Sequence, residues 1–143
     1  MLKVLEAGRL SPSAKNLQPL AFVVVTDPGL LGKLDSATNQ GWEAPTMLVG
    51  CAMPGNAWVR DDGEEYWKVD AAIAMQSMCL AAWGEGVGSC WICAFKEDQV
   101  KEILGIPDDV RVVALMAMGY PRVKKGPVEK RKALDELVHY DGW

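Results

Sequence analysis

The sequence predicts one α+β domain over residues 1–143, with a central mixed β-sheet flanked by helices. Short apolar runs typical of buried strands alternate with stretches in which apolar residues recur at helical spacing. Strand and helix signals in alternation indicate a sheet with helices packed on it. The length of 143 residues suits one compact domain and leaves no room for a second.

The composition is that of an ordinary globular protein and argues against several kinds of partner. Hydrophobic residues make up 50% of the chain and charged residues 24%, and the net charge is -4. This negative balance disfavours nucleic acid or an anionic membrane as the main partner. Lys3, Glu6 and Arg9 interrupt every candidate signal-peptide core. Four cysteines in a chain with this much core are expected to be free thiols in a reducing compartment, so we expect a cytoplasmic protein.

The first expected elements are a helix, a strand and a second helix. Leu2–Gly8 has the pattern of the last turns of a helix with no capping residue before it, so we expect an N-terminal segment to be missing. Ala21–Thr26 is an apolar, β-branched run bounded by turn residues, which predicts a buried strand. Asp27 can cap the next helix, with Pro28 at its first position and Leu34 on its apolar face.

The longest expected element is a helix over Tyr66–Trp83. The run Ala71–Trp83 is apolar or small except for Gln76 and Ser77, and Gly84 is placed to end the helix in a left-handed conformation. A helix that is apolar on nearly all sides must be buried on nearly all sides. A domain of this size has difficulty covering such a helix alone, so we expect a second subunit to cover the remaining face.

The rest of the chain continues the alternation of strands and helices. Further expected elements are a strand at Thr46–Ala52, a strand at Gly86–Phe95, a helix at Lys96–Leu104, a strand at Val110–Met118 and a helical segment around Leu134–Val138. Aromatic residues are unusual in a terminal tail, which is normally polar. Tyr140 and Trp143 are therefore expected to dock, either on their own domain or on a partner.

Cys90 and Cys93 have the C-x-x-C spacing of thiol redox centres and of half a zinc site. A zinc site needs a second pair of ligands, but Cys51 and Cys79 stand alone and His139 is the only histidine, so we expect no metal. A redox pair belongs at a helix N-terminus, where the thiol pKa is lowered, whereas these cysteines lie in a strand-like run. Two ordinary half-buried cysteines are the favoured interpretation, and a thiol redox protein is the alternative.

The segment Ser11–Pro19 is the most informative stretch for function. Ser11, Ser13, Asn16 and Gln18 place several hydrogen-bonding groups in one turn that leads into a buried strand. Such a turn suits recognition of the rim of a planar heterocycle or of a ribityl chain. The alternative is an ordinary helix-to-strand loop, which composition alone favours.

Three other motifs carry less information. The basic run Lys130–Lys132 could bind a phosphate, but such runs are more often solvated charge. Gly84, Gly86 and Gly88 follow an expected helix rather than a strand, so they are not a dinucleotide-binding fingerprint. A catalytic triad would depend entirely on His139, close to the chain end.

Taken together, these pieces resemble the FMN-dependent nitroreductase family, in the family's order and over essentially the whole chain. The segments that carry the resemblance are Leu10–Pro19 followed by Phe22–Val25, Glu43–Pro45, Asp70 with the alanine-rich helix, Gly86–Ile92, Val100–Pro107, Gly119–Pro121, and Lys130–Lys132 with Leu137–His139. Any one of these segments is a weak signal, and the ordered set is specific.

The resemblance implies an intertwined homodimer that holds two FMN molecules at the subunit interface. In one chain, the residues implied to border the flavin are Pro12, Ser13, Ala14 and Asn16, with Gln18 nearby. In the other chain, the residues implied to supply backbone contacts beside the ring are Gly88, Ser89, Cys90 and Trp91. Arg131, helped by Lys130, matches the position near the FMN phosphate. The long helix would lie in the dimer core, and the C-terminal segment would wrap the partner.

The implied reaction is a ping-pong oxidation of NAD(P)H through flavin N5, with a nitroaromatic, quinone or similar small aromatic acceptor. No side chain is expected to be catalytic, because the cofactor carries the chemistry. Family members usually open with an Arg-Arg-Ser-x-Arg-like stretch that grips the FMN phosphate, and this sequence starts after that point. The alternative is therefore a flavin-binding or scaffold protein of the same fold without efficient turnover.

Overall fold

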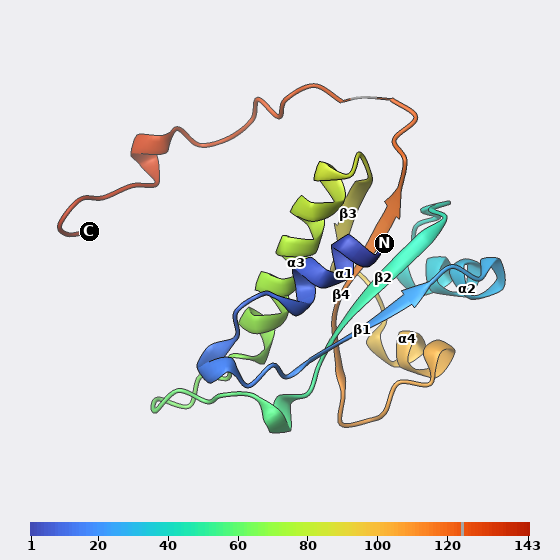
Figure 1. Cartoon of the computed structure of the whole chain (residues 1–143), viewed down its shortest axis with the longest axis horizontal. Coiled ribbons are helices and arrows are strands. Elements are labelled where there is room, and N and C mark those ends of the chain that lie inside the picture. The colour runs from blue at the N-terminus through green and yellow to red at the C-terminus, as the bar shows by residue number, and fades with distance from the viewer. Residues whose placement is uncertain (124) are drawn as a thin grey trace.

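Two layers of helices enclose a four-stranded β-sheet (Figure 1). The structure is a computed structural model and describes residues 1–123 and 125–143. The expected α+β class is confirmed. The helices and strands are α1 (Leu2–Arg9), β1 (Leu20–Val25), α2 (Pro28–Thr38), β2 (Thr46–Ala52), α3 (Trp67–Gly84), β3 (Gly88–Ile92), α4 (Glu97–Leu104) and β4 (Arg111–Gly119), and the short 3₁₀ helices are η1 (Ala14–Asn16), η2 (Pro54–Asn56) and η3 (Leu134–Glu136).

The sheet has the strand order β1-β2-β4-β3, and its pairings are all antiparallel among the residues described. We had expected a mixed sheet, and this expectation was wrong: the sheet is antiparallel. Alternation of strands and helices does not by itself fix the strand direction. Here α2 is followed by a return segment, residues 39–45, and the end of β1 pairs with the start of β2, Val25 opposite Met47. The connection therefore begins and ends at the same edge of the sheet.

Alternate residues of the central strands face opposite helical layers. The core between the sheet and the α1–α3 layer includes Val4, Leu48, Met75, Met78 and Met116. The core between the sheet and the α2–α4 layer includes Leu34, Val49, Val100, Leu115 and Ala117. Because both faces of β2 and β4 are covered, their sequences are continuous apolar runs, and this continuity made both strands predictable.

Two glycines allow α3 to approach its neighbours closely. A Cβ on Gly50 of β2 would lie 2.6 Å from the Sδ of Met75, and a Cβ on Gly8 of α1 would lie 2.7 Å from the Sδ of Met78. Both methionine side chains are fully buried. The methionines therefore occupy the space that these glycines leave, and they lock α3 against the sheet on one side and against α1 on the other.

The inner face of α3 is buried, but its outer face is not. Val69, Ile73, Leu80 and Trp83 are 43%, 37%, 64% and 61% exposed. They recur at alternating four- and three-residue intervals together with exposed Gln76, so they form one stripe along the helix. The expected burial on nearly all sides is not reached by the single chain, because the elements that pack most extensively on α3 are α1 and the strands of the sheet, which cover its inner face. Within residues 1–123 and 125–143 no helix, α3 included, is long and apolar enough to cross a membrane.

The C-terminal end of α3 differs from the expectation. Gly84 is the last helical residue, Glu85 follows with a φ of -90°, and the left-handed residue is Gly86, with a φ of 78°. The amide of Glu85 donates to the carbonyl oxygens of Ala81 and Ala82, at 3.1 Å each. At the end of α3 the Glu85 amide therefore shares its hydrogen between two carbonyl oxygens, and the left-handed residue is at position 86 instead of the expected position 84.

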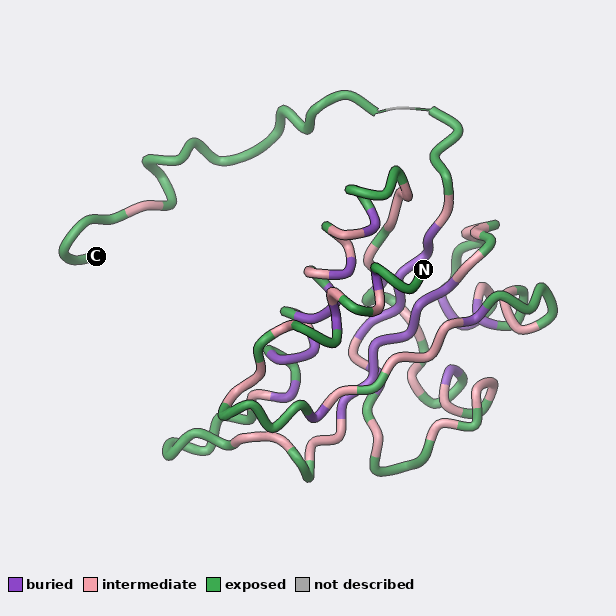
Figure 2. Tube along the Cα trace, in the orientation of Figure 1, coloured by how far each residue is buried: buried purple, intermediate pink, exposed green. Residues whose placement is uncertain are grey.

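The segment after β4 leaves the body of the protein as an exposed tail (Figures 1 and 2). The expected helical segment around Leu134–Val138 is reduced to the single turn η3. Tyr140 and Trp143 are 87% and 106% exposed, and the ring of Trp143 stacks on that of His139 at 4.8 Å between centroids. The two aromatic residues therefore do not dock on their own domain, and docking on a partner stays a prediction.

Candidate functional site

The turn between α1 and β1 has an unusual backbone shape. Lys15, Asn16 and Gln18 have positive φ angles of 50°, 55° and 52°, a region that costs a non-glycine residue about 1–3 kcal/mol. The amides of Gln18 and Asn16 donate to the Oγ and the carbonyl oxygen of Ser13, both at 2.9 Å. Ser13 therefore holds the turn together from inside.

Five predicted cofactor-binding residues lie on this turn. Pro12, Asn16 and Gln18 are exposed, and Ser13 and Ala14 are half-buried. The Ser13 Oγ accepts from the Gln18 amide, so its hydroxyl proton can still be donated to a ligand. The turn therefore presents donors and acceptors to the outside while its backbone is fixed.

Asp70, in the first turn of α3, ties this segment to the body of the protein. Its Oδ1 accepts a hydrogen bond from the Ala14 amide at 2.9 Å, and the side chain is only 1% exposed. Asp70 is among the residues that carry the family resemblance, but it was not predicted as a site residue. The available signal was a single acidic residue at the start of an otherwise apolar helix, which is where a carboxylate interacts favourably with the helix dipole.

The loop between β2 and α3 covers another side of the turn. The Lys15 ammonium lies 5.5 Å from the ring centroid of Trp58, and the Trp58 and Tyr66 rings are 4.9 Å apart. Arg60 donates to the Tyr66 hydroxyl at 2.7 Å and pairs with Asp62, also at 2.7 Å. The turn thus lies beside an aromatic pair, which sequence reasoning did not identify because these contacts are tertiary.

The other predicted cofactor-binding segment is β3, which is an edge strand of the sheet. Gly88, Ser89 and Trp91 are half-buried and Cys90 is exposed. Pairing with β4 uses the backbone groups on one side of β3, and an edge strand leaves those on its other side available. The Trp91 Nε1 is buried and has no hydrogen-bond partner within the described part of the chain. The backbone of β3 therefore has groups available for a ligand, and the predicted contact with a cofactor stays a prediction.

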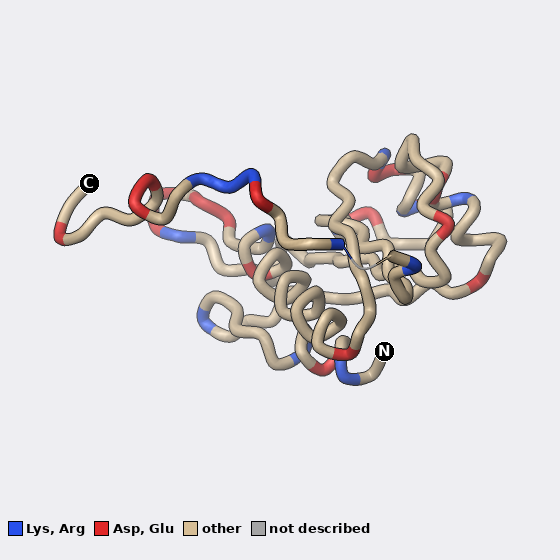
Figure 3. The backbone as a smooth tube through the Cα atoms, turned by 90° about the horizontal axis from the view of Figure 1, so that it is seen from above, with Lys and Arg blue, Asp and Glu red and all other residues tan. Residues whose placement is uncertain are grey.

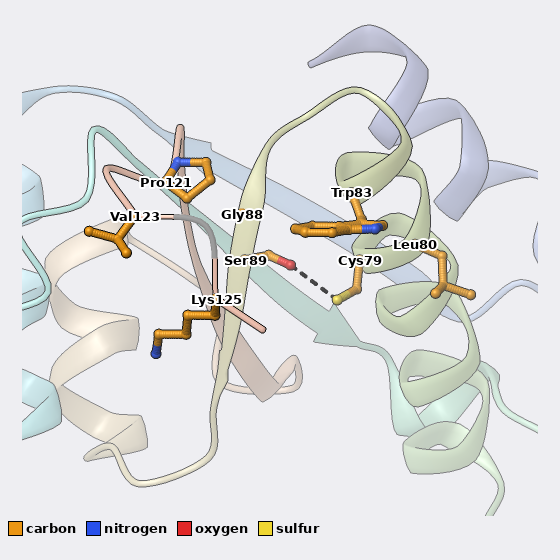
Figure 4. A pocket seen from close by; sticks show the side chains of 8 residues that line it. All are labelled: Cys79, Leu80, Trp83, Gly88, Ser89, Pro121, Val123 and Lys125. Atoms are coloured by element: carbon orange, nitrogen blue, oxygen red, sulfur yellow. Dashed lines mark hydrogen bonds between the residues drawn. The ribbon is translucent and has the colours of Figure 1, made fainter. Parts of the chain in front are cut away.

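A pocket of about 390 Å³ opens beside the start of β3. Its lining comes from α3, β3 and the start of the tail: Cys79, Leu80, Trp83, Gly88, Ser89, Pro121, Val123 and Lys125. Figure 4 shows the Cys79 Sγ and the Ser89 Oγ facing each other, at 3.0 Å. The pocket is mainly apolar, with Lys125 among its lining residues, and its size is in the range of small-molecule sites.

The two parts of the predicted site lie at different places along α3. Asp70 holds the turn and Cys79 contacts β3, and these two residues are nine positions apart in the helix. A rise of about 1.5 Å per residue places them roughly 14 Å apart along the axis and about half a turn apart around it. Figure 1 shows the turn near the N-terminal end of α3 and the start of β3 near its C-terminal end. One chain therefore does not bring the two parts together.

Lys130 and Arg131, the predicted phosphate ligands, lie on the exposed tail. The Arg131 Nη1 donates to the carbonyl oxygen of Lys130 at 2.9 Å. Figure 3 shows the basic segment projecting from the body on the tail. The structure therefore brings these residues to neither part of the site within the single chain.

The cysteines are arranged differently from the expectation. Cys90 and Cys93 are exposed rather than half-buried, because β3 lies at the edge of the sheet, and all four cysteines are free. Burial raises the pKa of Cys51 to about 11. The helix after the C-x-x-C motif begins only at Glu97, so no helix N-terminus lies at the motif.

No group of three or more potential metal ligands occurs among residues 1–123 and 125–143. Cys51, whose thiol pKa is raised by burial, lies in the core of the sheet and not at the candidate site. The described side chains therefore offer hydrogen bonding, apolar contact and isolated positive charge, and not a cluster of ionisable groups.

Comparison with known proteins places this geometry in context. The sequence model of the Nitroreductase family matches residues 38–120. An NADH dehydrogenase of Thermus thermophilus is 30% identical, with 95% of this chain and 82% of that protein covered. A crystal structure of a nitroreductase family protein from Clostridium difficile has a TM-score of 0.91 and 29% identity, and covers 99% of this chain and 85% of its own.

A further solved structure, described as an FMN-dependent nitroreductase from Clostridium difficile, has a TM-score of 0.83 and 27% identity. It covers 99% of this chain and 86% of its own length. The likeness thus extends from the turn before β1 through the pocket beside β3 to the tail. The family match, the sequence identity and the shared fold agree, and the chain belongs to the nitroreductase family.

Proposed function

We propose that this protein is an FMN-dependent NAD(P)H oxidoreductase that works as a homodimer. The observation that carries the proposal is the preformed turn at Pro12–Gln18, which lies where the resemblance to the nitroreductases puts the flavin. The names of similar proteins support the same reaction class, since one is an NADH dehydrogenase and another an FMN-dependent nitroreductase. The location that we propose is the cytoplasm, in agreement with the four free cysteines.

The residues of the turn fit a flavin. A flavin has a polar rim and a hydroxylated chain, and the turn offers the free hydroxyl proton of Ser13 together with the exposed amide side chains of Asn16 and Gln18. Pro12 and Ala14 add apolar contact beside these groups. Because the backbone is already held by hydrogen bonds, little ordering is needed on binding, which favours affinity.

The strand β3 and its pocket fit the remaining part of the cofactor site. The open edge at Gly88–Trp91 offers backbone groups, and Leu80 and Trp83 provide apolar surface that can exclude water from a bound ring. Lys125 lines the same pocket, and its ammonium group is proposed to turn toward a bound ligand and stabilise negative charge on it. Lys130 and Arg131 are proposed to contact the FMN phosphate when the tail lies against the second subunit.

A homodimer explains why the two parts of the site are separated in one chain. The exposed stripe on α3 is an apolar face that a second copy can cover. If two α3 helices pack about a two-fold axis perpendicular to them, they run antiparallel. The N-terminal end of one helix then lies near the C-terminal end of the other. The turn of one chain would meet β3 of its partner at each end of the helix pair, which gives two equivalent sites.

The chemistry that FMN supplies when bound is hydride acceptance at N5 from NAD(P)H and delivery to a nitroaromatic, quinone or related acceptor, in a ping-pong sequence. The residues of the chain bind, orient and shield. None of the described residues near the turn or the pocket is required to act as a general base.

The test is an absorbance spectrum of the protein after FMN addition and gel filtration, followed by NADH and NADPH oxidation assays with p-benzoquinone. We expect bound flavin, a molecular mass twice that of the 15.6 kDa chain, and acceptor-dependent oxidation. Protein that stays colourless after FMN addition would refute the proposal. Flavin that stays bound without turnover would support a binding protein of the same fold instead.

A further inference from the structure

We infer that Asp70 is a positioning residue, which fixes the Pro12–Gln18 turn in the shape in which it borders the flavin; this inference rests on the proposed function. Asp70 does not itself contact the proposed cofactor site. It acts through one hydrogen bond, from the Ala14 amide to Oδ1 at 2.9 Å.

The carboxylate of Asp70 lies in an environment that is unfavourable for a charged group. The side chain is 1% exposed, and Oδ2 is buried with no hydrogen-bond partner within residues 1–123 and 125–143. A buried carboxylate is costly unless it is paired or well hydrogen-bonded. Packing alone would be served by an apolar residue of similar size. The contact that distinguishes Asp70 from such a residue is the bond to Ala14, and a charged acceptor makes that bond strong.

The turn needs an external anchor because its backbone is strained. Lys15, Asn16 and Gln18 are left-handed without being glycine, and these conformations persist only where the surroundings enforce them. The internal bonds to Ser13 join the turn to itself. In the described part of the chain, the bond to Asp70 is the hydrogen bond that connects residues 12–18 to a distant element.

The helix gives Asp70 a rigid base. On either side of Asp70, Trp67 and Ala71 are buried in a small core with Ala52 of β2. A chain of fixed contacts therefore runs from the central sheet through α3 and the Asp70 carboxylate to the Ala14 amide. The position of the turn is set by the sheet and not by the loop itself.

The test compares three variants in the full chain by FMN titration, followed by flavin fluorescence, and by thermal unfolding. Asp70→Ala removes the acceptor, and Asp70→Asn keeps a neutral one. The control is Thr38→Val, because Thr38 is equally buried, at 2%, and its Oγ1 donates a hydrogen bond at the far side of the sheet from the turn. A hydrogen bond to a charged acceptor corresponds to about a ten- to hundredfold change in affinity.

We expect Asp70→Ala to raise the FMN Kd by that factor and Asp70→Asn to raise it less, while Thr38→Val lowers the melting temperature but leaves the FMN Kd within about twofold. An unchanged Kd in Asp70→Ala would overturn the inference. So would an equal loss in Thr38→Val, because affinity would then follow general stability. If Asp70→Ala does not fold, the FMN Kd of Asp70→Asn is compared with that of Thr38→Val, and a Kd that is raised no more in Asp70→Asn than in Thr38→Val would overturn the inference.

Amide hydrogen exchange separates this inference from the proposed function. Without FMN, exchange at Ala14 should be at least tenfold faster in Asp70→Ala than in the wild type, relative to amides of α4, if the bond contributes as expected. Equal exchange would overturn the inference whether or not flavin binds. Wild-type protein that binds no FMN would refute the proposed function, and the Ala14 exchange would then decide alone whether Asp70 holds the turn.

Discussion

Truncating the middle of the exposed α3 stripe should weaken the proposed dimer by an amount that follows from the exposure of one side chain. Ile73 is 37% exposed in the single chain and does not line the pocket. Complete burial of an isoleucine contributes about 1.5–3 kcal/mol, so covering the exposed third contributes roughly 0.5–1 kcal/mol per subunit and roughly 1–2 kcal/mol in a symmetric pair. Ile73→Ala should therefore raise the dimer Kd roughly 5- to 30-fold.

The assay is sedimentation velocity over a dilution series, with Gln99→Ala on α4 as the control. Gln99 is exposed on the helical layer on the other side of the sheet, so its truncation should leave the dimer unchanged. In the proposed dimer the two parts of the cofactor site come from different chains, so FMN affinity should fall wherever the dimer dissociates. A dimer Kd equal to that of the wild type, or full FMN affinity in monomers, would refute the reasoning.

Three further outcomes are expected. Gly50→Ala places a Cβ 2.6 Å from the Sδ of Met75 and should destabilise the protein by about 1–3 kcal/mol in urea unfolding; wild-type stability would show that Met75 has room to move. The guanidinium of Arg111 lowers the pKa of Glu97 below its usual 4.5. The ion pair therefore stabilises the folded protein above pH 4.5, and this stabilisation is lost as the pH falls through the lowered pKa of the folded state. The stability difference between wild type and Arg111→Ala should thus be larger at pH 7 than in acid, and a constant difference would contradict the role of the pair. Cys93→Ser should leave NAD(P)H oxidation unchanged, whereas a marked loss would favour thiol redox chemistry.

The sequence was sufficient for elements whose signal is local. The β2 strand runs from Thr46 to Ala52 as predicted, because its residues are apolar on both faces. The start of α2 was predicted from capping, and the Asp27 carboxylate does accept the Leu30 amide at 2.9 Å. Strand direction, by contrast, depends on how the connections fold back, and no residue pattern within the strands encodes it.

The candidate site was predictable in part. The position of the turn followed from its polar residues, but the left-handed conformations of Lys15, Asn16 and Gln18 did not, because none of these residues is glycine. The anchor at Asp70 depends on a contact between residues far apart in sequence. The separation of the turn from β3 within one chain could be seen only once the course of α3 was known.

The contacts of Met75 with Gly50 and of Met78 with Gly8 make α3 a spacer of fixed length. Between Asp70 and Cys79 an inserted residue would lengthen the helix by about 1.5 Å and rotate everything beyond it by about 100°. Either change would displace Met75 and Met78 from their packing against Gly50 and Gly8, and it would misalign the two halves of each proposed site. Variation in chain length should therefore be tolerated in the loop between β2 and α3 and excluded from this part of the helix.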